Sequence, residues 1–108
     1  MTKAELSSPM RWLVERCQQI NFGSVTFHVR GGEPDLGRSH SRVRTLKVAG
    51  GFNGFRPEVA SDDFELRREH IALFEQLKEL PDGTRVRVKI THGLPGTTID
   101  LLEGQQAA

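Results

Sequence analysis

A short segment in the last quarter of the sequence separates positive charge from apolar side chains. Residues 84–90 alternate between the apolar Val86, Val88 and Ile90 and the basic Arg85, Arg87 and Lys89. Because strand side chains point alternately to opposite faces, this period of two predicts a half-buried strand with a row of cations facing solvent. The cations would lie about 7 Å apart, close to the roughly 6–7 Å between successive phosphates along a nucleic-acid strand, which is about twice the 3.4 Å base step. The row therefore suggests phosphate binding.

Other basic residues would join this row if the neighbouring strands pair with it in one sheet. The predicted nucleic-acid-binding residues are Arg30, Arg42, Arg44, Arg85, Arg87 and Lys89. A structural explanation stands beside the functional one, because outer faces of antiparallel strands are commonly charged and edge cations block aggregation. The sequence has no tyrosine and lacks the paired strand aromatics with which RNA-recognition motifs stack bases. Phosphate contacts are therefore expected rather than recognition of bases.

A glycine-rich stretch at residues 50–57 supplies the alternative function. It holds Phe52 and Phe55, with Arg56 beside them. The two aromatic rings could stack on bases or enter a partner's pocket, or they could fold back over the core. Together with the loop at 31–41, this stretch makes a protein-interaction or regulatory module the alternative to nucleic-acid binding. A small-molecule site between the sheet and a loop is a minor third option.

Residues suited to catalysis or metal binding do not form a recognised pattern. The four histidines, His28, His40, His70 and His92, lack the spacing of a zinc site. Cys17 lies in an apolar helical stripe, where cysteine usually acts as a small hydrophobic side chain. Asp62 and Asp63 are better explained as helix-capping residues, and the glycine-rich loops lack the lysine of a P-loop. We therefore predict a non-enzymatic protein without a metal or cofactor.

Composition indicates one small domain spanning residues 1–108, with flexible ends at 1–6 and 104–108. The net charge is only +1, so attraction to nucleic acid would require local segregation of charge. The single cysteine excludes an internal disulfide. No apolar run approaches the 18 residues of a membrane span, and we expect a bacterial, cytoplasmic protein whose oligomeric state the sequence does not indicate.

The remaining elements follow from periodicity and capping. A helix should start at Ser7 or Ser8, with Pro9 in its first turn, and end near residue 21. Strands are expected at 24–30, 42–49 and 97–102, and a second helix should begin at 61–63. With the basic strand, the order is helix, strand, strand, helix, strand, strand. We predict an α+β fold with a mainly antiparallel four-stranded sheet and both helices on one face.

A faint internal repeat relates the two halves at an offset of 61 residues. Matching positions are Leu13 with Phe74, Val25 with Val86, Phe27 with Val88, Val29 with Ile90, Gly32 with Gly93, and Pro34 with Pro95. A helix and a lone hairpin bury their apolar faces poorly, so two paired halves are physically sensible. Duplication and chance identity in turns both explain the pattern.

Residues 20–29, read Ile-Asn-Phe-Gly-Ser-Val-Thr-Phe-His-Val, and residues 42–46, read Arg-Val-Arg-Thr-Leu, carry a resemblance. Over about residues 12–48 the chain resembles the small uncharacterised bacterial family of YezD type. That family has a helix, an aromatic-Gly-Ser-Val entry to a strand, a β-hairpin and a basic end. The longer loop at 31–41 replaces the family's short hairpin turn. The resemblance implies a fold rather than an activity.

Overall fold

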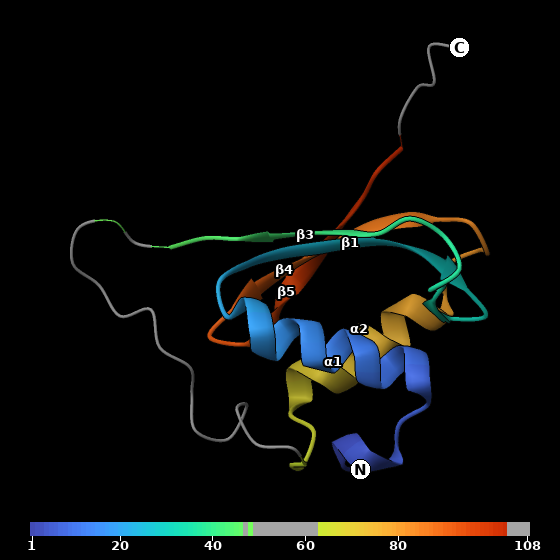
Figure 1. The fold of residues 1–108 in the computed structure, drawn as a ribbon. Coiled ribbons are helices and arrows are strands. Elements are labelled where there is room, and N and C mark those ends of the chain that lie inside the picture. The colour runs from blue at the N-terminus through green and yellow to red at the C-terminus, as the bar shows by residue number, and fades with distance from the viewer. Residues whose placement is uncertain (47, 49–62, 104–108) are drawn as a thin grey trace.

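The computed structural model describes residues 1–46, 48 and 63–103. Over these residues the chain has an α+β fold in which two helices cover one face of an antiparallel sheet (Figure 1). The elements are η1 (Lys3–Glu5), α1 (Ser8–Ile20), β1 (Gly23–Arg30), β2 (Glu33–Pro34), β3 (Ser41–Arg44), α2 (Arg68–Lys78), β4 (Arg85–Thr91) and β5 (Leu94–Leu101). Neither helix is long and apolar enough to cross a membrane.

The sheet is built around β1 and β4, which pair antiparallel along most of their length. β5 continues the sheet beyond β4, and β3 and β2 share the other side of β1. The first half of β1 pairs with β3 and its last two residues pair with β2. The sheet therefore has five strands where four were predicted, because the 31–41 loop contains the short β2.

Helix α1 forms where the sequence predicts it. Ser7 is the N-cap, and its hydroxyl accepts a hydrogen bond from the backbone N–H of Met10 at 3.4 Å. Pro9 lies in the first turn, where its missing N–H costs nothing. Asn21 ends the helix with a φ of 64°, a conformation that asparagine tolerates better than most residues.

Helix α2 begins later than predicted, at Arg68 instead of 61–63. Asp62 of the predicted capping box lies outside the described residues, and Glu65 lies in an isolated bridge with Thr2. The actual N-terminal cap uses His70, whose Nδ1 accepts a hydrogen bond from the backbone N–H of Arg67 at 3.0 Å. The local pattern was misleading because residues 63–66 are held extended by a segment more than 60 positions away.

That segment is the N-terminal end, residues 1–6, for which the sequence predicts flexibility. Its backbone bonds to residues 63–66, with Lys3 N–H donating to the Phe64 carbonyl at 3.0 Å and Leu66 N–H donating to the Met1 carbonyl at 2.9 Å. The buried Lys3 ammonium reaches α1, where it donates to Gln18 Oε1 at 2.9 Å and lies 3.5 Å from Glu15. These contacts join the start of the chain to α1 and to the segment that precedes α2.

The core lies between the helices and the covered face of the sheet, as predicted. Strand residues Val25, Phe27, Val29, Val86, Val88 and Ile90 form one cluster with helix residues Leu13, Cys17, Leu73, Phe74 and Leu77. Burying such side chains is the main stabilising contribution to a domain of this size. The predicted orientation of the basic strand is thereby confirmed.

The 61-residue offset recurs in the geometry of the sheet. Across the centre, Thr26 pairs with Arg87, its own equivalent at that offset. The pair Val29–Pro34 in the first half corresponds to Ile90–Pro95 in the second. The two hairpin turns also match, since Gly31 and Gly32 have φ of 61° and 76°, and His92 and Gly93 have 55° and 75°. Positive φ at both central residues is typical of the two-residue type I′ turn. The second turn is therefore shorter than the predicted 92–96, and β5 starts at Leu94.

Candidate functional site

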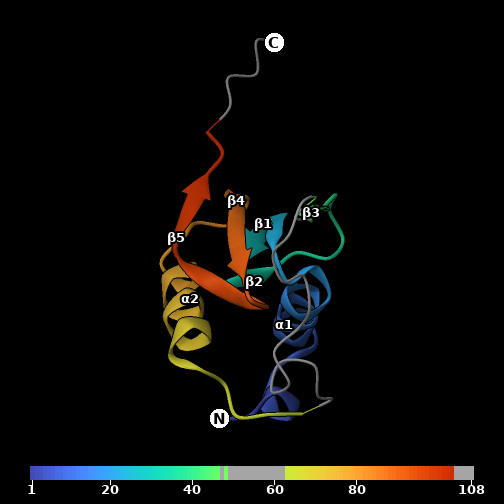
Figure 2. The ribbon, with the colours of Figure 1, turned by 90° about the vertical axis from the view of Figure 1, so that its left-hand side faces the viewer.

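The uncovered face of the sheet carries the predicted row of cations. Arg85, Arg87 and Lys89 are exposed on β4, and the valines between them are fully buried. Their neighbours across β1 are His28, Thr26 and Ser24, in that order. Both helices lie on the opposite side of the sheet (Figure 2). The three cations are therefore exposed on the side of the sheet that neither helix covers.

The central cation of the row has an acidic partner within the sheet. Asp100 of β5 lies directly across from Arg87, and its Oδ2 accepts hydrogen bonds from Arg87 Nη2 at 2.9 Å and Nε at 3.1 Å. No ion pair within the described residues engages Arg85 or Lys89. Among the described residues, the row thus has two cations without an ion pair and a partly neutralised one between them.

Arg30 extends the same face at the end of β1. The register places Glu33 of β2 opposite Arg30. The Glu33 carboxylate, however, accepts a hydrogen bond from the hydroxyl of Ser7 at 2.7 Å, at the start of α1. Arg30 therefore remains available on the open face and belongs with the cations of β4.

Arg42 and Arg44 do not lie on this face, and their predicted placement is wrong. The register sets Arg42 opposite Val25 and Arg44 opposite Gly23, so both side chains leave the sheet on the side of the helices. Arg42 Nη1 donates to Gln19 Oε1 of α1 at 2.9 Å. A one-residue change of register moves a whole strand to the other face, and the exposed Val43 occupies the position where a cation was expected.

The predicted partner-binding residues Phe52, Phe55 and Arg56 lie outside the described residues. The other predicted interaction loop, 31–41, is described and is partly ordered by short hydrogen bonds. Asp35 Oδ1 accepts from the backbone N–H of Gly37 at 3.0 Å. Leu36 is exposed, whereas the ring of His40 packs against Trp12 at 4.9 Å between centroids.

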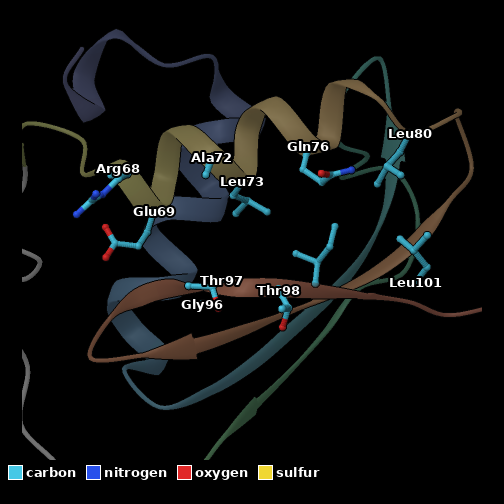
Figure 3. Close-up of a pocket in the computed structure, with 11 residues that line it drawn as sticks. Arg68, Glu69, Ala72, Leu73, Gln76, Leu80, Gly96, Thr97, Thr98 and Leu101 are labelled. Carbon is cyan, nitrogen blue, oxygen red and sulfur yellow. The ribbon is translucent and has the colours of Figure 1, made fainter.

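A cleft of about 750 Å³ between α2 and β5 is a feature that the sequence did not indicate. Leu73 of α2, Leu80 just beyond its end and Leu101 of β5 supply apolar side chains to it, while Arg68 and Glu69 lie near one end (Figure 3). In the described part of the chain β5 pairs only with β4, so its outer edge is open beside the cleft. The cleft depends on how α2 packs over the sheet, which periodicity alone does not specify.

The nucleophile and metal-ligand candidates remain apart from one another. Cys17 is buried in the core, and burial raises the pKa of its thiol to about 12. The thiol is therefore protonated at neutral pH and unsuited to nucleophilic attack. No group of three or more His, Cys, Asp or Glu side chains in residues 1–46 and 63–103 is arranged to hold a metal ion.

Neither family models, nor curated proteins, nor solved structures contain a match to this chain. The resemblance to the YezD-type family thus stays a prediction about fold. The function has to be inferred from the surfaces described above.

Proposed function

We propose that this domain is a non-enzymatic module that binds nucleic acid through phosphate contacts on the uncovered sheet face. The observation that carries the proposal is the exposed row Arg85, Arg87 and Lys89, extended by Arg30, on a face that neither helix covers. Outward side chains on a strand repeat about every 6.6 Å. A phosphodiester chain presents its charges at a comparable repeat, so one strand of nucleic acid could follow β4.

The chemistry of this face supports backbone contacts without recognition of sequence. Ser24, Thr26 and His28 add hydrogen-bonding groups beside the cations. The rings of Trp12 and Phe27 pack in or against the core on the helix side of the sheet. They therefore cannot stack on bases at the opposite face. Binding by phosphates alone is salt-dependent and, at physiological salt, about micromolar or weaker.

Fluorescence polarisation with mixed-sequence single-stranded and duplex oligonucleotides, over a series of salt concentrations, tests the proposal. Four cations allow a slope of log K against log salt no steeper than about −3.6 on duplex and about −2.8 on single strands. The double variant Arg85→Gln/Lys89→Gln should flatten the slope by nearly two units on duplex DNA. Asp100→Asn should strengthen binding, because it releases Arg87 from its ion pair.

A matched control removes the same charge from the helix layer. Arg68 and Lys78 are exposed on α2, and Arg68→Gln/Lys78→Gln should leave the slope nearly unchanged. If both double variants flattened the salt slope equally, net charge alone would drive association with the oligonucleotide. Absence of salt-dependent binding at low salt would reduce the row to an ordinary solvated strand face.

A protein partner is the second candidate, and the observation that favours it is the cleft beside the open edge of β5. An extended peptide can add a strand to such an edge while its side chains enter neighbouring pockets. If the oligonucleotide experiment fails, this surface becomes the leading candidate for binding.

A further inference from the structure

A second cavity, of about 330 Å³, lies between α1 and β3 on the helix side of the sheet. Its lining residues are Trp12, Arg16, Val25, His40, Ser41 and Arg42. Because Arg42 shares the covered face with Val25, this cavity faces away from the cations of β4. The cavity volume is within the range of small-molecule sites.

The lining is positively charged and includes no carboxylate. Two guanidinium groups, those of Arg16 and Arg42, face the same space. The nearest acid on α1, Glu15, is engaged with Lys3 at 3.5 Å. Arg42 donates to the neutral amide oxygen of Gln19, so no acid among the described residues offsets the two charges.

Arg16 has an unmet hydrogen-bonding requirement. Its guanidinium carbon lies 5.6 Å from the centroid of the Trp12 ring, and its Nε is buried without an acceptor. Leaving a buried donor unpaired is costly, and more so for a charged group. An oxyanion in the cavity would not reach this Nε, which has no accessible surface, but could accept charge-assisted hydrogen bonds from the terminal nitrogens of the same guanidinium.

Trp12 forms one wall of this space. Its ring meets Phe27 of the core edge-on at 6.3 Å and meets His40 at 4.9 Å between centroids. A flat group of a ligand could pack against the indole while its anionic group contacts the arginines. Such a division of roles is common where one end of a ligand is charged and the other is planar.

We propose that this cavity binds a small ligand carrying a phosphate group, with Arg16 and Arg42 contacting the phosphate oxygens. The proposal is independent of nucleic-acid binding on the opposite face. Free phosphate ion and the phosphate of a nucleotide share this chemistry, and the experiment separates them.

Trp12 is the single tryptophan of the sequence, so intrinsic fluorescence reports directly on the cavity. Inorganic phosphate, adenosine monophosphate and adenosine are titrated at constant ionic strength maintained with potassium chloride. Phosphate and adenosine monophosphate should give saturable changes with a dissociation constant of about 1 mM or tighter, whereas adenosine should give none. Tighter binding of the nucleotide than of the free ion would identify an organic phosphate as the ligand.

Arg16→Gln and Arg42→Gln should each weaken phosphate binding about tenfold or more. Circular dichroism and thermal melting establish that each variant is folded, and two variants keep the test valid if one of them is not. Lys78→Gln, which removes an exposed cation of α2 away from the cavity, should retain the wild-type dissociation constant. No saturable change with either phosphate compound, or unchanged affinity in both folded arginine variants, would overturn the proposal. The two proposals are tested separately. Absence of phosphate binding in the cavity would not change the salt slope expected for oligonucleotides, and absence of oligonucleotide binding would not change the phosphate affinity expected for the cavity.

Discussion

At the scale of single residues, His70 is a buried titratable group that helps to form the start of α2. Its side chain is 1% exposed, and its ring lies 5.8 Å from Phe64 and 6.4 Å from Phe74 between centroids. Burial lowers the pKa of His70 to about 4, a shift that Glu69 opposes and Arg67 reinforces. The neutral ring is required here because Nδ1 must accept the hydrogen bond from the Arg67 N–H.

This depressed pKa makes stability depend on pH in a defined window. Between about pH 4 and 6.5 the unfolded chain binds a proton at His70 that the folded chain does not, so stability is complete above this window and is lost as pH falls through it. His70→Gln keeps an acceptor for the cap but does not titrate. Lowering pH from 7 to 4.5 should cost the wild type about 2–3 kcal/mol more than His70→Gln. Urea unfolding of both proteins measures this difference, and equal losses would show that His70 titrates normally in the folded state.

At the scale of secondary structure, the sequence correctly predicted the features that depend only on residues close together in the chain. The alternation in 84–90 specified which face of β4 is buried, and Ser7 with Pro9 marked the start of α1. The first residue of α2 and the face of the sheet on which the arginines of β3 lie were predicted wrongly, because each depends on contacts with residues distant in sequence. Residues 63–66 bond to the first residues of the chain, and β3 takes its register from β1 after a loop whose length does not determine it. The same limitation explains why Arg42 and Arg44 were assigned to the wrong face.

The pairing of β1 with β3 depends on one glycine, which gives a prediction at this scale. Gly23 has a φ of 151°, and a Cβ at this position would collide with the backbone carbonyl of Val43. Gly23→Ala should therefore displace β3 and cost at least about 2 kcal/mol. Chemical denaturation measures the cost. Gly37→Ala is the control, since its Cβ would meet only Asp35 Oδ1 at 3.4 Å, and its effect should stay within about 0.5 kcal/mol. Similar losses in both variants would contradict a specific role for Gly23.

At the scale of the whole molecule, the two halves are related across the Thr26–Arg87 pair but differ at their outer strands. In the second half the hairpin leads directly into the eight-residue β5. In the first half the equivalent strand is divided into β2 and β3, separated by residues 35–40. All four residues of β3 are exposed, whereas Leu94 and Pro95 of β5 are buried and Ile99 packs on the core. The repeat thus produces a symmetric centre with unequal edges.

This asymmetry predicts how the domain opens under native conditions. The hydrogen-bonded amides of β1 and β4 lie in the middle of the sheet and over the core, so they should exchange with solvent only through global unfolding. Amides of β3 should exchange at least about tenfold faster than those of β5, because little apolar surface holds β3 in place. Native-state hydrogen exchange followed by NMR makes the comparison within one sample, with β4 as the internal reference. Exchange of β3 as slow as that of β4 would mean that the sheet opens as one unit, and that the cavity lined by Arg16 and Arg42 is as rigid as the core.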